Sequence, residues 1–157
     1  MEKKFKLHHV GYIVEDAEKS AQHFKTFYGV EDFAVYDFRP SKAWSYGEEV
    51  KEYQLKIAMS TTKNGETGIE IIQPIVGKGV HKDFIESGNS GMHHVCIAVD
   101  KEEYDTYRND FANRGYSFLF ESETEDEVIG YRRCFYAKDT DTEMVMEIKE
   151  NPYFRKK

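Results

Sequence analysis

The chain of 157 residues is poor in cysteine and has no excess of positive charge. Its two cysteines, Cys96 and Cys134, form neither a CxxC pair nor a disulfide framework, so we expect free thiols and a cytoplasmic location. The formal net charge is −7, from 29 acidic and 22 basic residues. Because a surface that binds phosphates must be basic, this charge excludes nucleic acid as the main partner.

Long apolar stretches are also missing. No run approaches the ~20 residues of a membrane-spanning helix, so we expect no membrane partner. Met1–Leu7 is a short basic stretch that leads directly into a strand, and we interpret it as something other than a signal peptide. What the chain does contain is 39% hydrophobic and 15% aromatic residues, which is enough for the core of one compact domain over residues 1–157.

The two halves of the chain share one order of elements. In the first half, the pattern predicts a helix that begins after Asp16 and ends at Gly29, and an irregular segment at Asp37–Gly47. The strands expected in this half are Leu7–Val14, Lys51–Ser60 and Gly68–Gln73. In the second half, a helix follows Asp100 and ends at Gly115. The strands expected there are Met92–Val99, Tyr116–Glu121, Tyr131–Ala137 and Met144–Lys149.

This order indicates a βαβββ unit that occurs twice. The first module covers about residues 5–75 and the second about residues 91–150, and the linker 76–90 contains a short helix at about Val80–Glu86. Each copy begins with a strand that carries two adjacent histidines and ends with a glutamate on an apolar strand. The sequence therefore predicts an α+β protein built from two equivalent halves.

Four polar side chains occupy equivalent places in the two copies. His9 and His94 lie on the first strands, and Glu70 and Glu147 lie on the last strands. Since alternate residues of a strand share a face, we expect all four on the face that carries the small side chains. Any one of them alone is as well explained by an ordinary surface or core position. Their coincidence in both copies favours one shared divalent ion, Zn, Ni, Co or Mn, because a buried carboxylate needs charge compensation.

The other histidines have simpler interpretations. His8 and His93 should face away from the proposed cluster, and His23 and His81 should lie on the surface. Three further residues are candidates for substrate contact, with a solvated edge position as the alternative for the two charged ones: Lys56, Arg133 and Gln54. The two basic residues stand at the same distance in sequence, 14 residues, before the two proposed glutamate ligands.

At this point the residues match a known family. The stretches LHHVGYIVEDAEKSAQHFKTFYGV and IEIIQP…DFIESGNSGMHHVCIAVD resemble the vicinal oxygen chelate superfamily, which includes glyoxalases, bleomycin-resistance proteins and dioxygenases. Within it, the chain looks most like methylmalonyl-CoA epimerase and then glyoxalase I. The resemblance implies paired βαβββ modules that form a curved mixed sheet around a metal cleft, with the helices outside. It places the metal ligands on His9, Glu70, His94 and Glu147.

The resemblance also implies a chemistry. A metal-dependent isomerase, an epimerase or racemase, would abstract a proton α to a carbonyl through a metal-bound enolate, with Glu147 and Glu70 as candidate bases. The implied partners are a small carbonyl substrate and a second copy of the chain, in a homodimer formed through edge strands. The alternatives that stay open are a lactoylglutathione lyase (glyoxalase I), a ring-cleaving dioxygenase with Fe(II), and a non-catalytic drug-binding resistance protein. A second glutamate ligand argues against the dioxygenase, which uses two histidines and one carboxylate.

Overall fold

The computed structural model describes residues 6–63 and 65–156, so most of the basic stretch predicted at Met1–Leu7 lies outside the described residues. The described residues form three helices, α1 (Ala17–Tyr28), α2 (Val80–Glu86) and α3 (Lys101–Asn113). They also form ten strands: β1 (His9–Ile13), β2 (Phe33–Phe38), β3 (Lys42–Ser45), β4 (Glu48–Val50), β5 (Gln54–Ser60), β6 (Gly68–Val76), β7 (Gly91–Val99), β8 (Ser117–Asp126), β9 (Gly130–Lys138) and β10 (Val145–Glu150). The predicted α+β class is confirmed.

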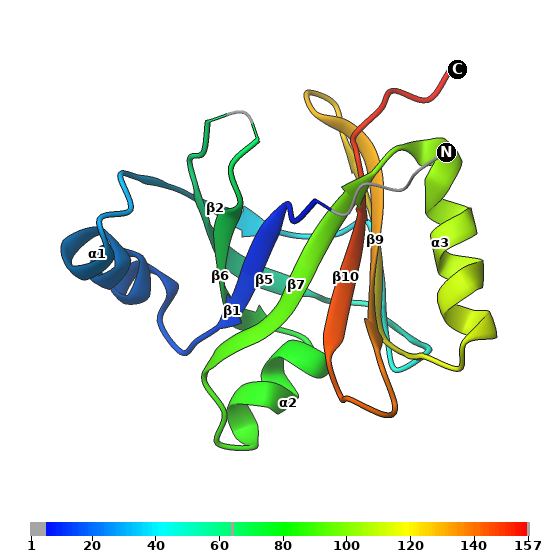
Figure 1. The fold of residues 1–157 in the computed structure, drawn as a ribbon, viewed down its shortest axis with the longest axis horizontal. Helices are drawn as coiled ribbons and strands as arrows, with labels where there is room; N and C mark the ends of the chain where they lie inside the picture. The colour runs from blue at the N-terminus through cyan, green and yellow to red at the C-terminus, as the bar shows by residue number, and fades with distance from the viewer. Residues whose placement is uncertain (1–5, 64, 157) are drawn as a thin grey trace.

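All ten strands of the described chain belong to one mixed sheet that curls into a half-barrel (Figure 1). Their order is β2-β5-β6-β1-β7-β10-β9-β8-β3-β4. Strand β1 is parallel to β6, and β7 is parallel to β10. Strands β1 and β7 pair antiparallel at the centre of the sheet, so the first strands of the two copies lie side by side.

The two longer helices begin and end where the sequence predicts. The side chain of Asp16 accepts a hydrogen bond from the backbone N–H of Lys19, and Gly29 ends α1 with φ of 70°. Asp100 and Glu103 form a capping box at the start of α3. Helix α1 packs on β5 and β6 and α3 packs on β9 and β10, both on the convex side of the sheet (Figure 1). Among the described residues, no helix is long and apolar enough to cross a membrane.

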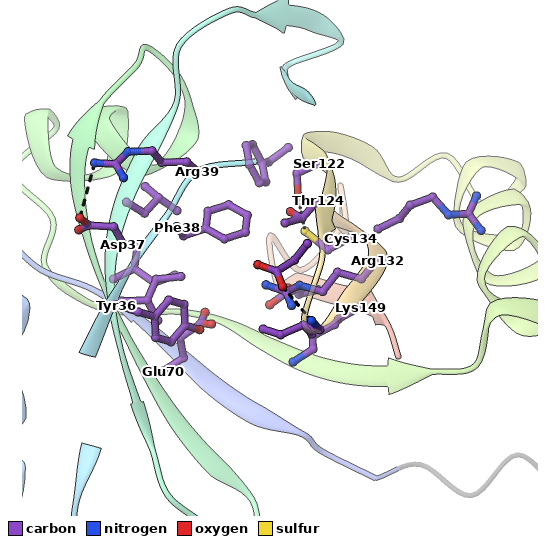
Figure 2. A pocket seen from close by; sticks show the side chains of 18 of the residues that line it. Tyr36, Asp37, Phe38, Arg39, Glu70, Ser122, Thr124, Arg132, Cys134 and Lys149 are labelled. Carbon is purple, nitrogen blue, oxygen red and sulfur yellow. Dashed lines mark hydrogen bonds and ion pairs between the residues drawn. The ribbon is translucent and has the colours of Figure 1, made fainter. Parts of the chain in front are cut away.

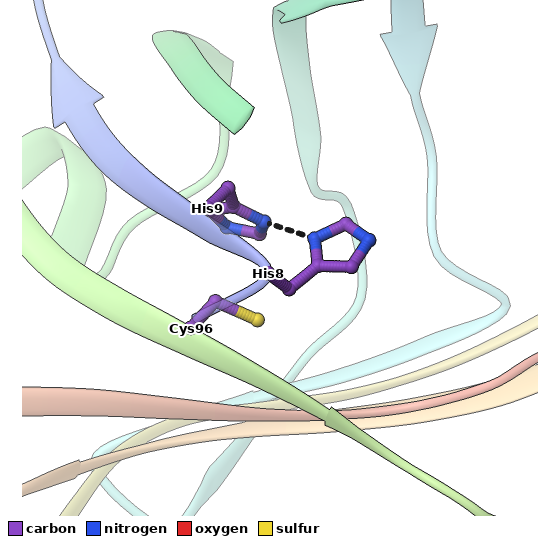
Figure 3. Close-up of side chains that lie close together, drawn as sticks. All are labelled: His8, His9 and Cys96. Atoms are coloured by element: carbon purple, nitrogen blue, oxygen red, sulfur yellow. Dashed lines mark hydrogen bonds between the residues drawn. The ribbon is translucent and has the colours of Figure 1, made fainter. Parts of the chain in front are cut away.

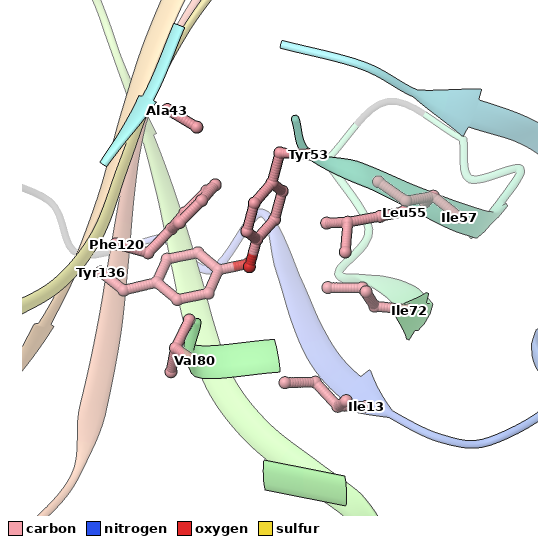
Figure 4. Close-up of a cluster of buried hydrophobic side chains, with 9 residues drawn as sticks. All are labelled: Ile13, Ala43, Tyr53, Leu55, Ile57, Ile72, Val80, Phe120 and Tyr136. Carbon is pink, nitrogen blue, oxygen red and sulfur yellow. The ribbon is translucent and has the colours of Figure 1, made fainter. Parts of the chain in front are cut away.

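The concave side of the sheet holds a separate core (Figure 4). Strands from both halves contribute to it, and α2 adds a side chain at one end of the half-barrel. Its buried members are Ile13, Ala43, Tyr53, Leu55, Ile57, Ile72, Val80, Phe120 and Tyr136. The inside of the half-barrel is therefore partly filled by apolar side chains, and only part of it remains open.

The segment Asp37–Gly47 was predicted to be irregular, and that prediction is wrong. It contains the end of β2 and the whole of β3, which forms a hairpin with β4. Strand β3 also pairs with β8 of the second half, with Ala43 opposite Ser122. This pairing joins residues that are far apart in sequence, so no local sequence pattern indicates it. Residues 39–41 connect β2, at one end of the sheet order, to β3, near the other end.

His81 was predicted to lie on the surface, and this prediction is also wrong. Its side chain is fully buried in the concave core. The Nδ1 atom lies 2.6 Å from the Tyr53 hydroxyl oxygen, and the Nε2 atom lies 3.1 Å from the Tyr136 hydroxyl oxygen. Both ring nitrogens are thus paired, and this pairing offsets the free-energy cost of burying a polar ring. The sequence around α2 gives no sign that two tyrosines from distant strands meet there.

Burial of His81 should make stability depend on pH. Burial, with a smaller contribution from His93 and His94, lowers the pKa of His81 from 6.5 to about 3. Between these values only the unfolded state takes up the proton, so this contribution to stability is complete above pH 6.5 and falls as the pH falls toward 3. We expect the loss between pH 7 and pH 5 to be roughly 2 kcal/mol.

Urea denaturation of the wild-type protein and the His81→Gln variant at both pH values measures this difference. Glutamine keeps a donor and an acceptor near the two tyrosines but does not titrate. Subtracting the two proteins cancels the titration of every other group. Equal dependence on pH in the two proteins would contradict the assignment.

Candidate metal centre

Four side chains meet on the concave face of the four central strands. They are His9 on β1, Glu70 on β6, His94 on β7 and Glu147 on β10. One potential ligand atom from each lies within 4.8 Å of the others, and all four residues are buried. These are the residues that the sequence singled out as metal ligands, and the described structure brings all four of them together.

The strand register explains why they meet. On one row across the sheet, His9 lies opposite Cys96, and Cys96 lies opposite Glu147. On the next row, Glu70 and His94 lie on either side of Gly11. Residues directly opposite each other on paired strands point to the same face. Each row therefore carries two of the four ligands with a small residue between them, which leaves room for their side chains to converge.

Gly11 is required by close packing. A Cβ atom at this position would lie 2.1 Å from the Cε1 and Nε2 atoms of His94. Real Cβ atoms do not approach a ring so closely, so any larger residue would displace the imidazole. The glycine in the first strand thus sets the position of a ligand on the strand beside it. The sequence placed Gly11 on the correct face but did not reveal this contact.

The cluster concentrates opposite charges in a dry environment. The Nε2 atom of His9 lies 3.0 Å from Glu147 and 3.4 Å from Glu70, and Nε2 of His94 lies 3.1 Å from Glu147. Burial raises the pKa of Glu70, but His9 and His94 outweigh burial and bring it down to about 2. Burial lowers the pKa values of both imidazoles, and the two carboxylates more than reverse that effect and raise them. Protons on the histidines thus balance the carboxylates.

The residues present fit a divalent metal ion. Two protons on the imidazoles supply the same charge as one divalent cation, so exchange of the protons for the ion keeps the cluster neutral. The buried Nε2 atom of His94 has no hydrogen-bond partner among the described residues, although a carboxylate oxygen lies 3.1 Å away. Once its proton is released, this Nε2 atom carries a lone pair directed toward the cluster, and a metal ligand needs that arrangement. Two imidazoles and two carboxylates suit Zn, Ni, Co or Mn, as predicted.

The first histidine of each pair orients the second, which is the one in the cluster. Nδ1 of His8 lies 2.8 Å from Nδ1 of His9, and Nδ1 of His93 lies 3.1 Å from Nδ1 of His94. Burial lowers the pKa of His8 to about 4 and that of His93 to about 3, so both are neutral at pH 7 and accept a hydrogen bond. The inner rings then carry the proton on Nδ1 and turn Nε2 toward the cluster.

Cys96 lies next to the cluster but is poorly suited to join it (Figure 3). Its thiol, with His8 and His9, forms a second group of potential ligand atoms. Burial raises the pKa of Cys96 to about 12, with Glu147 adding to the effect, so the thiolate is disfavoured. The Nδ1 atoms of the two histidines are already engaged with each other. Cys96 and Cys134 are both free thiols, as predicted.

A cavity of about 550 Å³ opens beside the cluster (Figure 2). Its lining includes Glu70 and Glu147 but neither imidazole of the cluster. Apolar side chains from both halves also line it, among them Leu55, Ile72 and Phe120. A small molecule in this cavity would therefore meet the two carboxylates directly, with the histidines behind them.

The three predicted substrate contacts lie elsewhere or are already occupied. Lys56 points to the convex face, where its Nζ lies 3.3 Å from a carboxylate oxygen of Glu18 on α1. Gln54 is not part of the cavity lining described here. Arg133 borders the cavity, but its guanidinium lies 3.0 Å from Glu150 and 2.9 Å from Asp105. Substrate binding by these residues stays a prediction that their positions do not support.

Two basic residues that the sequence did not single out do line the cavity: Arg132 and Lys149. The alternation of side chains along a strand could have identified both residues. Lys149 is two residues after Glu147 on β10 and shares its face, and Arg132 is four residues before Tyr136 on β9. The equal spacing of 14 residues that pointed to Lys56 and Arg133 had no structural meaning, because both side chains lie on the outer face.

A half-barrel of two βαβββ halves, with paired His–Glu ligands at its centre, defines the vicinal oxygen chelate class of metal-site proteins. Residues 8–135 match the family described as the Glyoxalase/Bleomycin resistance protein/Dioxygenase superfamily. The chain belongs to this superfamily. No curated protein matches it significantly.

Solved structures show the same fold at low identity. Methylmalonyl-CoA epimerase from Mycobacterium tuberculosis is 15% identical, with a TM-score of 0.61 over 94% of this chain and 88% of that one. A variant of the Streptomyces coelicolor epimerase, in complex with 2-nitronate-propionyl-CoA, is 15% identical, with a TM-score of 0.62 over 96% and 100%. A variant of 4-hydroxymandelate synthase from Streptomyces coelicolor is 14% identical, with a TM-score of 0.60 over 97% of this chain. The present chain spans only 49% of that synthase.

Proposed function

We propose that the protein is a metal-dependent isomerase, an epimerase or racemase, that abstracts a proton α to a carbonyl group. The observation that carries this proposal is the position of Glu70 and Glu147. Both carboxylates line the cavity, they come from different strands, and they stand in the same charged cluster. Two carboxylates beside one substrate carbon are what an exchange of its proton across both faces requires.

The four clustered residues, His9, Glu70, His94 and Glu147, would hold the cation. When bound, a divalent cation lowers the free energy of negative charge on a substrate oxygen, and this makes the neighbouring C–H bond more acidic. Glu147 takes the proton from the α-carbon, and the electron pair of the C–H bond moves toward the carbonyl. Glu70 passes a proton taken from solvent water to the opposite face of the same carbon, and Glu147 releases its proton to water, so both carboxylates return to their starting state. The apolar lining keeps bulk water from the reacting carbon.

A lactoylglutathione lyase is the second candidate. Its first step is the same proton abstraction, followed by return of the proton to the neighbouring carbon. The carboxylate at position 70 favours this candidate, because the glyoxalase I enzymes that the chain resembles carry a glutamate there. A dioxygenase with two histidines and one carboxylate is less well supported, because both glutamates belong to the cluster.

Solvent deuterium tests the proposal. The metal-loaded protein is incubated in D₂O with methylmalonyl-CoA, with the hemithioacetal of glutathione and methylglyoxal, and with aromatic ketones that have an acidic α-carbon. Mass spectrometry should show deuterium at the α-position of at least one compound, and removal of the metal should stop the incorporation. Metal-loaded protein that binds an aromatic compound tightly but exchanges no proton would instead support a drug-binding protein. Iron as the tightly bound metal would support the dioxygenase.

We further propose a homodimer formed through edge strands and a cytoplasmic location. The first rests on the exposed outer strand β2, whose Val35 and Tyr36 are 45% and 40% exposed. The second rests on the two free thiols. Size-exclusion chromatography with light scattering, repeated with a charged residue at position 35, tests the first.

A further inference from the structure

The cavity beside the metal centre contains two positive charges that form no salt bridge within the described chain. Arg132 on β9 and Lys149 on β10 both line it, and both are half-buried. The salt bridges of the described residues involve other cations, and neither Arg132 nor Lys149 takes part in one. The neighbouring Arg133 shows the contrast, because its guanidinium is held by Glu150 and Asp105.

The register places the two cations together on the concave face. Lys149 lies opposite Cys134 in the β10–β9 pair, and Arg132 is the next residue along β9 on the same face as Cys134. Figure 2 shows Arg132 and Lys149 close to each other, across the cavity from Tyr36 and Asp37. Lys149 is also only two residues from Glu147, so the pair lies beside the proposed reaction centre.

A third polar group, the hydroxyl of Thr124, also indicates a ligand site in this part of the cavity. Thr124 lines the same cavity, and its buried Oγ1 atom has no hydrogen-bond partner in the described structure. Buried hydroxyl groups are usually paired, so an unpaired one at a cavity wall marks a place for a ligand atom. Of the acidic residues that line the cavity outside the cluster, Asp37 pairs with Arg39, and Asp126 accepts hydrogen bonds from the backbone N–H groups of Val128 and Ile129. The side chain of Glu125 is exposed, so solvent screens its charge.

Charge balance then indicates the sign of the ligand. A divalent ion cancels the two carboxylates of the cluster, and Arg132 and Lys149 then remain as half-buried positive charges of the cavity wall without a salt bridge in the described chain. Positive charges that are partly removed from water gain most from a bound anion. The overall charge of −7 makes this local excess of positive charge more selective, since the rest of the surface repels anions.

We propose that Arg132, Lys149 and the hydroxyl of Thr124 form an anion subsite, and that the substrate is a small carbonyl compound with a carboxylate or phosphate group at its other end. The apolar side chains of Leu55, Ile57 and Phe120 border the space between the subsite and the carboxylates of the cluster. This inference rests on the proposed function only for the reacting end of the substrate.

Bifunctional chelators test the subsite separately from the chemistry. A hydroxamate group binds divalent metal through two oxygen atoms, so succinic monohydroxamate carries a metal-binding end and a carboxylate end. Its primary amide has the same shape without the charge, and 3-phosphonopropionohydroxamate replaces the carboxylate by a phosphonate. Isothermal titration of the zinc-loaded protein gives the three dissociation constants, for the wild type and for Arg132→Gln and Lys149→Gln.

We expect at least one anionic probe to bind the wild type 10-fold to 100-fold more tightly than the amide. Each hydrogen bond to a charged group lowers the dissociation constant by about a power of ten or more. Both variants should reduce that ratio toward 1 while the affinity of the amide stays unchanged. Lys25→Gln removes an exposed lysine from α1 on the convex side and should keep the wild-type ratio. Preference for the carboxylate or for the phosphonate identifies the natural anionic group.

Two results would overturn the subsite. Equal binding of the anionic probes and the amide by the wild type contradicts it and leaves the metal centre intact. A preference that survives in both variants means that other residues recognise the anion. If no probe binds the zinc-loaded protein, the bound metal does not accept two oxygen atoms of a ligand, and the proposed function falls together with the subsite.

Discussion

Replacing Glu147 by glutamine should reduce solvent deuterium exchange by ~10²–10⁴-fold, because a positioned general base accounts for an effect of that size. Glutamine keeps the shape of the side chain and one oxygen atom that can contact a cation, but it cannot take up the α-proton. Burial raises the pKa of Glu147, but hydrogen bonds and charge from His9 and His94 outweigh burial and hold that pKa well below its usual range, so the carboxylate is ionised at neutral pH. The rate is measured by mass spectrometry per mole of bound metal, which separates loss of the base from loss of the cation.

Glu86→Gln is the matched control for this measurement. Glu86 lies at the end of α2, is 61% exposed and pairs only with Lys82 in the described structure. Its replacement removes the same charge without touching the cavity, and exchange should continue at the wild-type rate. A Glu147→Gln protein that holds its metal and exchanges at the wild-type rate would exclude Glu147 as the base and leave Glu70 as the remaining candidate.

The second large effect concerns the metal itself. We expect His94→Ala to lose most of its tightly bound divalent ion, because it removes one of four ligands, and the buried Nε2 atom of this ligand has no hydrogen-bond partner in the described chain. Elemental analysis after gel filtration in metal-free buffer measures the loss. The ligand-induced stability should disappear as well, which amounts to about 4 kcal/mol when free metal exceeds its dissociation constant 1,000-fold.

His93→Ala is the control for the metal experiment. His93 accepts a hydrogen bond from the ligand ring but contributes no atom to the four-residue cluster. Its loss should weaken metal binding by about 10-fold to 100-fold, as is usual for a residue that orients a ligand, and the protein should still bind metal at stoichiometric loading. If His93→Ala abolished binding and His94→Ala did not, strand β7 would be shifted by one residue, and every side chain on it would face the other way.

Much of the site could be predicted because it depends on local rules that repeat. The alternation of side chains along a strand and the matching places in two copies were enough to bring His9, Glu70, His94 and Glu147 to one face. Those rules need no knowledge of which strands become neighbours. The capped ends of α1 and α3 belong to the same kind of local information.

What could not be predicted depends on pairing between distant strands. The hairpin β3–β4 forms because β8 offers an edge, and His81 is buried because Tyr53, just before β5, and Tyr136, on β9, both reach its ring. Equal sequence spacing says nothing about which face is concave: Lys56 pairs with Glu18 on the convex face, and the guanidinium of Arg133 is held by Glu150 and Asp105. The division of the chain at residues 76–90 stays a prediction.

The short connection between β2 and β3 limits how far the half-barrel can open. Four Cα–Cα steps separate Phe38 from Lys42, and a fully extended chain covers at most about 14 Å in that number of steps. The two strands lie near opposite ends of the sheet, so residues 39–41 form a covalent tether across the open side of the half-barrel. Thermal motion can separate the end of β2 from the start of β3 only up to the extended length of residues 39–41. The distance between the end of β2 and the start of β3 is therefore limited by the length of the backbone itself, whatever the side chains do.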